Sequence, residues 1–186
     1  MSQYLLLADV ENDQVNSMLA SPNFIAADVV VISMRYGKNR DRTRSILIHL
    51  PSFLDRLNST GKQLIIISAC PEFGLSDNGK TLYDRELLSE VRIDSIGNFS
   101  YKVNLKCYEE RNLEIDKKNN QIKELSEVRG IKFSDRLDLV CNIKEPLCYG
   151  ITLDDHKAFY DYGHYTLEAA KYFGRRIHEM NWLELE

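Results

Sequence analysis

The chain has 186 residues, of which 44% are hydrophobic and 28% charged, and its formal net charge is −4. This composition is ordinary for a globular domain, and we predict a single domain over residues 1–186. Acidic residues slightly outnumber basic ones, so the chain lacks the positively charged surface that nucleic-acid-binding proteins present. No nucleic-acid partner is therefore expected. No apolar run reaches the roughly 18 residues that span a bilayer, and the N-terminus lacks the pattern of a signal peptide.

The first half of the chain predicts alternating helices and strands. One or two short helical pieces are expected within residues 4–19. Residues 27–34 are rich in β-branched side chains without alternation, which is typical of a strand buried on both faces. Residues 44–58 have helical spacing, in which Pro51 predicts a kink or a late start. A second buried strand is expected at residues 63–69, so the order strand, helix, strand favours a parallel sheet.

The second half continues the alternation. We predict a short helix at residues 82–91, no clear period over 94–106, and a strong helix over 109–129. A third strand, interrupted near its middle, is expected at residues 131–140. An amphipathic helix follows at residues 167–179. The pattern predicts an α/β fold with three α/β/α layers and a mostly parallel sheet, whose sites gather in loops after the strands.

The four cysteines are Cys70, Cys107, Cys141 and Cys148, and none forms a C-x-x-C pair. A zinc site is therefore not expected, and no metal is predicted. Cys141 and Cys148 are seven residues apart. They are either two reduced thiols or a small disulfide loop, and the disulfide would require an oxidising compartment.

Residues Gly74–Thr81 match the phosphate-binding pattern G-x-x-x-x-G-K-[ST]. That site needs a strand running directly into the first glycine and a helix starting at the Lys-Thr end. Here Cys70–Phe73 separates the predicted strand from Gly74, and no strand ending in a metal-binding Asp is evident. The alternative is a polar surface turn. Nucleotide binding at Gly74–Thr81 stays as a further hypothesis for the function.

Near the C-terminus, Asp161 and His164 are three residues apart in a glycine-containing loop before the last helix. An Asp that orients a His acting as general base is half of a Ser-His-Asp triad. The alternative is a chance pair on a surface loop.

The segment Asp138–His178 resembles the end of the SGNH domain carried by membrane O-acyltransferases of cell-surface polysaccharides. The residues that carry the resemblance are Leu139-Val140-Cys141, then Cys148, then Tyr160-Asp161-Tyr162-Gly163-His164-Tyr165-Thr166-Leu167-Glu168-Ala169-Ala170. Weaker similarity at residues 28–36 and 61–71 extends the resemblance over about residues 27–182. It implies an SGNH-hydrolase fold, flavodoxin-like in its layers.

The resemblance also implies a function. An acyl group is held on a serine and passed to a sugar hydroxyl or to water, without a cofactor. His164 would be the general base and Asp161 would orient it. The substrate would be an acyl-sugar or polysaccharide, and a membrane acyltransferase portion would be supplied by upstream sequence. From their place at the end of a predicted strand, Arg35 and Asn39 are expected to line the substrate pocket or to help an oxyanion, and Tyr36 and Tyr162 are expected to line the pocket too. Solvent-facing or packing roles are the alternative.

The main departure from this family is the nucleophile. The chain has no Gly-Asp-Ser block, and its nearest counterpart is Ala8-Asp9-Val10. We therefore expect an N-terminally truncated domain, since Ser33 and Ser68 lie inside predicted strands. The competing hypothesis is a non-catalytic remnant or carbohydrate-binding module on the same fold. The expected location is extracytoplasmic, on the periplasmic side, within a membrane acyltransferase, and cytoplasmic for a chain that stands alone.

Overall fold

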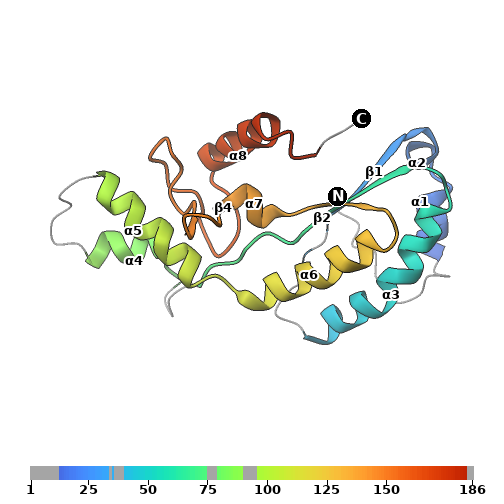
Figure 1. Ribbon diagram of the computed structural model, residues 1–186, viewed down its shortest axis with the longest axis horizontal. Coiled ribbons are helices and arrows are strands. Elements are labelled where there is room, and N and C mark those ends of the chain that lie inside the picture. Colours follow the sequence, from blue (N-terminus) through green and yellow to red (C-terminus); the bar gives the residue numbers. More distant parts are fainter. Residues whose placement is uncertain (1–12, 34, 36–39, 75–78, 90–95, 184–186) are drawn as a thin grey trace. The chain divides into compact units, whose positions relative to one another are not determined.

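The computed structural model of the chain (Figure 1) describes residues 13–33, 35, 40–74, 79–89 and 96–183. The chain divides into two compact units. Unit 1 comprises residues 1–69 and 119–134, and unit 2 comprises residues 70–118 and 135–186.

Unit 1 contains a three-stranded sheet in the order β1-β2-β3. The strands are β1 (Val29–Ser33), β2 (Gln63–Ile67) and β3 (Lys132–Ser134). Both pairings are parallel, with Val31 opposite Ile65 and Ile66 opposite Phe133. The predicted α/β fold with a parallel sheet is therefore confirmed.

The two predicted strands of the first half differ in burial. In β2 the residues Leu64–Ile67 are all buried, as expected for a central strand. In β1 the side chain of Val31 is 48% exposed. The prediction that this strand is covered on both faces is wrong, because β-branched composition reports strand propensity and not the number of covered faces.

Three helices of unit 1 precede or connect these strands: α1 (Asp13–Leu19), α2 (Pro22–Ala26) and α3 (Arg40–Asn58). The hydroxyl of Ser21 accepts a hydrogen bond from the Phe24 N–H and so caps α2. α3 begins before Pro51 and runs through it, so a late start is wrong. The buried side chains of α3 recur at helical spacing: Leu50, Phe53, Leu54 and Leu57.

The strong helix predicted over residues 109–129 corresponds to α6 (Leu113–Glu127), whereas α5 (Ile96–Glu109) lies in the stretch that shows no clear period. The break between them has a local cause. The side-chain oxygen of Asn112 accepts the Glu114 N–H at 3.2 Å, and Arg111 forms an isolated β-bridge with Phe73. The prediction therefore began α6 four residues early and did not identify α5, because the residues of 94–106 show no clear apolar period.

Unit 2 holds the remaining elements: α4 (Leu82–Ser89), α7 (Arg136–Val140), β4 (Cys141–Asn142), β5 (Leu147–Cys148) and α8 (Leu167–Glu179). The third strand, predicted at residues 131–140, is confirmed only over its first part, as β3. It ends at Ser134, since the Asp135 carboxylate accepts the Leu137 N–H at 2.9 Å and starts α7. β4 and β5 form a short antiparallel hairpin.

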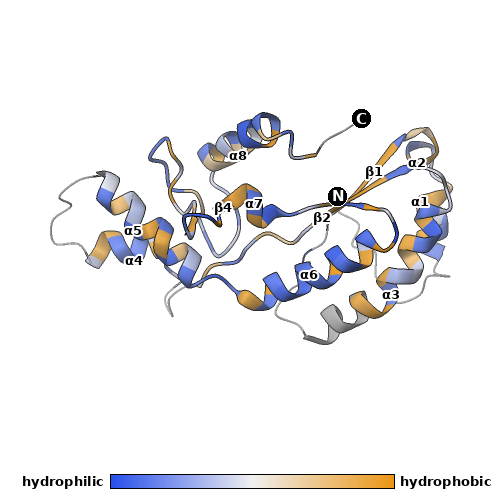
Figure 2. Cartoon of the chain, viewed as in Figure 1, coloured by the Kyte–Doolittle hydropathy of each residue, from blue (hydrophilic) through white to orange (hydrophobic). Residues whose placement is uncertain are grey.

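The core of unit 2 is rich in aromatic side chains. Phe73, Phe99, Tyr149, Phe159 and Phe173 are buried together with aliphatic residues from α4, α5, α7 and α8. Figure 2 shows apolar and polar residues mixed along α5 and α6, as expected of half-buried helices. Among the described helices, none is both long and apolar enough to cross a membrane.

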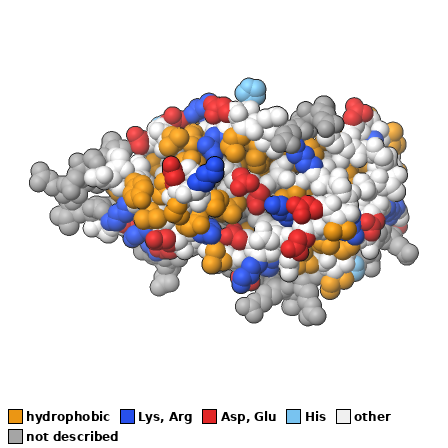
Figure 3. All heavy atoms as spheres, in the orientation of Figure 1, with side chains coloured by type: hydrophobic (Ala, Val, Ile, Leu, Met, Phe, Trp, Pro, Cys, Tyr) orange, Lys and Arg blue, Asp and Glu red, His pale blue; other side chains and the backbone are white. Residues whose placement is uncertain are grey.

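Charged side chains of both signs are interspersed on the face drawn in Figure 3. The ion pairs include Arg129 with Asp55 in unit 1 and Lys157 with Asp84 in unit 2. The mixture agrees with the net charge of −4.

Candidate functional site

The loop that carries Asp161 and His164 is closed by backbone hydrogen bonds. Phe159 and Tyr165 form an antiparallel β-bridge, and the Tyr160 N–H donates to the His164 carbonyl at 3.1 Å. One step further out, the Thr166 N–H donates to the Ala158 carbonyl at 2.9 Å. The loop is therefore a short hairpin turn in which Tyr160 and His164 face each other.

The structure brings the two residues of the predicted pair into direct contact. Oδ2 of Asp161 lies 2.6 Å from Nδ1 of His164. Oδ1 of Asp161 accepts the backbone N–H groups of Gly163 and His164 at 3.0 and 2.8 Å. One carboxylate thus folds the loop and binds the ring.

These contacts determine the charge state of Asp161. Burial raises the pKa of the Asp161 carboxyl, but the hydrogen bonds from Gly163 and His164 outweigh burial, and the pKa lies below its ordinary value. An ionised carboxylate only accepts hydrogen bonds, so in the neutral imidazole the proton lies on Nδ1 and Nε2 holds a lone pair. The His164 side chain is 46% exposed, which leaves the ring accessible to a substrate.

Two tyrosine rings flank the imidazole. The ring of Tyr160 is stacked on it, with centroids 5.7 Å apart and an interplanar angle of 13°. The ring of Tyr162 meets it edge-on, at 5.6 Å and 63°. The sequence prediction named Tyr162 for the substrate pocket, and the structure puts it against His164. The sequence prediction did not name Tyr160 for the pocket. Its contact with the imidazole could have been inferred from its position opposite His164 across the turn.

The segment Cys70–Phe73, which follows β2 in the sequence, supports this loop from within unit 2. The Phe73 N–H donates to the Tyr162 carbonyl at 2.9 Å, and the Phe73 ring packs on Phe159 at 4.8 Å. A hydrogen bond of 3.3 Å joins the Cys70 thiol and the Tyr165 hydroxyl. The loop is therefore anchored on both sides of Asp161.

The helix that follows the loop begins as predicted. Oγ1 of Thr166 accepts the Ala169 N–H at 3.2 Å and donates to the Lys157 carbonyl at 2.7 Å. Thr166 is the N-cap of α8. This cap ties the start of α8 to the strand-like segment before the loop.

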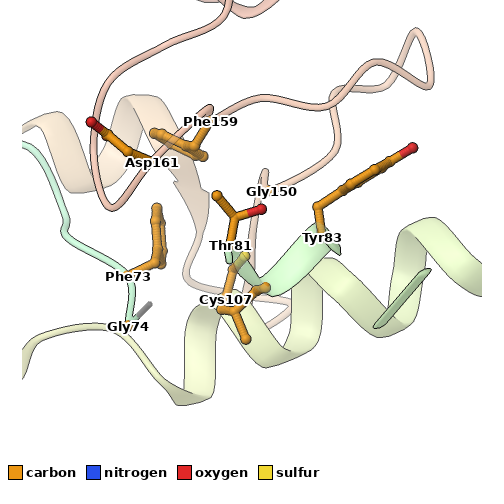
Figure 4. A pocket seen from close by; sticks show the side chains of 9 residues that line it. Phe73, Gly74, Thr81, Tyr83, Cys107, Gly150, Phe159 and Asp161 are labelled. Atoms are coloured by element: carbon orange, nitrogen blue, oxygen red, sulfur yellow. The ribbon is translucent and has the colours of Figure 1, made fainter. Parts of the chain in front are cut away.

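A pocket of about 260 Å³, which includes space open to solvent, lies beside the loop (Figure 4). Its lining is mostly apolar and comprises Phe73, Gly74, Thr81, Leu82, Tyr83, Cys107, Gly150, Phe159 and Asp161. Figure 4 shows the Asp161 carboxylate directed away from the Phe73 and Phe159 rings. Burial raises the pKa of the Cys107 thiol to about 12, so this cysteine is not a thiolate nucleophile.

The nucleotide hypothesis finds no support in the described part of Gly74–Thr81, of which residues 75–78 lie outside the description. β2 ends at Ile67, well before Gly74. In phosphate-binding loops, the hydroxyl at the last position of the motif binds Mg²⁺. Here that position is Thr81, whose hydroxyl donates a hydrogen bond to the Asp84 carboxylate at 2.7 Å. Thr81 and Asp84 cap the start of α4 instead.

Cys141 and Cys148 are joined by a disulfide, with an S–S distance of 2.00 Å. They face each other across the β4–β5 pair, with Cα atoms 3.9 Å apart. The bond closes the hairpin that precedes the Asp161/His164 loop. Cys70 and Cys107 are not part of a disulfide.

The remaining predicted pocket residues are Arg35, Tyr36 and Asn39. Arg35 is exposed two residues beyond β1, in unit 1, whereas Tyr36 and Asn39 lie outside the described residues. Ser33 is exposed and Ser68 is fully buried. Ala8-Asp9-Val10 also lies outside the described residues. Among those that are described, no group of three His, Cys, Asp or Glu side chains could hold a metal ion.

Comparison with known structures supports the fold. The periplasmic domain of the lipopolysaccharide acetyltransferase from Salmonella ser. Paratyphi A is similar, with a TM-score of 0.59 and 15% sequence identity. The match covers 83% of this chain but 56% of that domain, so the chain corresponds to little more than half of it. No curated protein matches the sequence.

The sequence matches a family model over residues 7–179, nearly its whole length. The model is that of the SGNH domain fused to AT3 domains. The resemblance inferred from the residues around Asp161 and His164 is thereby confirmed. The chain belongs to the family of SGNH domains that are fused to AT3 domains.

Proposed function

We propose that this domain takes part in acyl transfer or ester hydrolysis on O-acylated saccharides, with His164 as general base and Asp161 orienting it. The observation that carries the proposal is the 2.6 Å contact between Asp161 Oδ2 and His164 Nδ1 in a partly exposed loop. It fixes the tautomer in which Nε2 accepts a proton. The acetyltransferase domain with a similar fold supports the reaction class.

The proposed chemistry is a proton relay around an acyl carbonyl. A hydroxyl oxygen attacks the carbonyl carbon while its proton moves to Nε2 of His164. The ester C–O bond then breaks, and the same proton passes to the departing alkoxide. The carboxylate of Asp161 stays ionised throughout and stabilises the imidazolium that forms between the two transfers.

The nucleophile of this reaction is proposed to come from another segment of the whole protein. The chain lacks Gly-Asp-Ser, and Ser68 is fully buried in unit 1. A membrane acyltransferase portion is the proposed partner, since the family is fused to AT3 domains.

We propose an extracytoplasmic location. The Cys141–Cys148 disulfide supports it, because such bonds persist in oxidising compartments. The periplasmic location of the similar acetyltransferase domain supports the same placement.

The second candidate is a non-catalytic, carbohydrate-binding domain. The missing Gly-Asp-Ser block favours it, and so does the Tyr160 ring, which is 60% exposed beside the loop. An exposed aromatic face stacks well on a sugar ring. In this case Asp161 and His164 would serve only to shape the loop.

Hydrolysis of acetylated sugar esters by the whole protein separates the two candidates. We expect His164→Ala to abolish the activity of the parent, and His178→Ala, an exposed histidine on α8, to leave it unchanged. A fluorophosphonate probe should label one serine in the parent, which mass spectrometry would locate. Activity that survives His164→Ala would remove the general-base role and favour the binding domain.

A further inference from the structure

The imidazole of His164 is held on three sides by its own loop. Asp161 contacts Nδ1 in the ring plane, Tyr162 meets the ring edge-on, and Tyr160 covers a face. Asp161 and Tyr162 are themselves anchored, by the Gly163 N–H and the Phe73 N–H respectively. Tyr160 differs from them because its side chain is 60% exposed.

The position of Tyr160 follows from the turn. The Phe159–Tyr165 bridge and the bond from the Tyr160 N–H to the His164 carbonyl make residues 160 and 164 neighbours across a hairpin. Facing side chains on one side of an antiparallel pair interact, and aromatic pairs do so most strongly. The interplanar angle of 13° between the two rings is therefore a product of the loop's backbone.

We propose that Tyr160 is a positioning residue for His164, an inference that rests on the function proposed above. The torsion that turns an imidazole about its own axis is broad, so an exposed ring has more than one accessible orientation. Turning it out of the plane parallel to the Tyr160 ring moves Nδ1 away from the Asp161 carboxylate. The stacked Tyr160 ring restricts that rotation, and aromatic pairing favours the ordered arrangement roughly two- to tenfold.

This role predicts a spectroscopic signature that a purely structural role lacks. With the ring fixed, nearly all His164 rings carry the proton on Nδ1, so the Nδ1 and Nε2 nitrogen resonances are widely separated. A ring that turns freely exchanges between tautomers, and the two resonances move toward each other. Stacking on Tyr160 also displaces the His164 ring-proton resonances upfield.

The test is NMR of the imidazole nitrogens in the full chain, near neutral pH, for the parent and three variants. Tyr160→Phe keeps the ring and should retain the parent spectrum. Tyr160→Ala should bring the Nδ1 and Nε2 resonances closer together and remove the upfield displacement. Tyr101→Ala is the matched control, since Tyr101 is 57% exposed on α5 and remote in sequence from the loop.

Parent-like nitrogen resonances in Tyr160→Ala would overturn the proposal. Backbone resonances outside residues 159–165 report whether this variant is folded, and the exposure of Tyr160 predicts that it is. The readout involves no acyl transfer, so it is independent of the function proposed above. Activity that survives His164→Ala would remove that function and leave the NMR result standing.

Discussion

Asp161 contacts His164 twice, once through the ring and once through the backbone. Oδ2 lies 2.6 Å from Nδ1, and Oδ1 accepts the backbone N–H of the same residue at 2.8 Å. The second bond fixes the Cα of His164 relative to the carboxylate, and the first fixes the ring. The pair is therefore a rigid local unit, and its consequences can be tested residue by residue.

Asp161→Asn should reduce any His164-dependent ester turnover by about two to four orders of magnitude, because an amide can donate to Nδ1 and stabilise the wrong tautomer. The KM for the sugar ester should change little. Steady-state kinetics of the whole protein measures both constants. Asp154→Asn, an exposed carboxylate outside the loop, serves as control. A variant with full kcat would contradict the orienting role.

The lowered pKa of Asp161 gives a signed dependence of stability on pH. Since the folded state holds the proton less tightly than the unfolded state, whose reference value is 3.8, ionised Asp161 contributes stability above that value. This contribution is lost as the pH falls through the folded pKa. Thermal unfolding of the parent and Asp161→Asn between about pH 6 and pH 2 should show a stability difference that shrinks on acidification. A constant difference would contradict the assignment.

Asn119 on α6 is expected to be important for the stability of unit 1. Its side-chain amide is buried, accepts the Ala69 N–H at 3.0 Å and donates to the Ala69 carbonyl at 3.1 Å. Asn119→Ala leaves both groups without these partners and should lower the free energy of unfolding by about 2–4 kcal/mol. Asn120→Ala removes the adjacent, exposed amide and should be neutral or slightly stabilising. Urea denaturation of both variants measures the difference.

Gly150 is a position where a methyl group does not fit. A Cβ there would overlap the Cys107 Sγ atom and lie 3.1 Å from Cγ1 of Val103. Gly150→Ala should cost about 1–3 kcal/mol of stability, and Cys107→Ala in the same chain should relieve part of the loss. Gly174→Ala in α8 meets nothing within 4 Å and should stabilise by about 0.5–1 kcal/mol. Calorimetry of the parent and these three variants tests the contrast.

The Cys141–Cys148 disulfide closes a short loop, so its effect on stability is moderate. By the loop-entropy relation, Cys141→Ser with Cys148→Ser should lower the free energy of unfolding by about 2–3 kcal/mol. Reductant should destabilise the parent by a similar amount and leave the double variant unaffected. Equal sensitivity of both proteins to reductant would mean that the effect comes from other cysteines.

The sequence predicted the parallel strands and most helices because their signals are local. The apolar run at β2 and the amphipathic pattern of α8 each lie within one element. Helix α5 was missed because residues 94–106 show no clear apolar period. The start of α6 was placed too early, since it depends on the Asn112 side chain and on a bridge from Arg111 to Phe73, a distant residue in the chain. The exposure of Val31 was missed for a similar reason, because burial depends on what packs against a strand.

At the site, the spacing of Asp161 and His164 was enough to predict their contact, as both lie in one turn. The stacking of Tyr160 needed the hairpin closure between Phe159 and Tyr165, which the sequence analysis did not resolve. The role of Cys70–Phe73 as a support for the loop depends on the tertiary fold of unit 2. Long-range contacts of this kind leave no periodic trace in the sequence.

The turn from Phe159 to Tyr165 carries most of what aligns Asp161 with His164. The acid, the base and the stacked ring all lie within five consecutive residues, and most of the bonds that align them are internal to the turn. The contact between Asp161 and His164 is therefore set mainly by the turn, and the support from Cys70–Phe73 is the part that comes from elsewhere in unit 2. A segment built in this way keeps the Asp161–His164 contact largely independent of the sequence that precedes the turn.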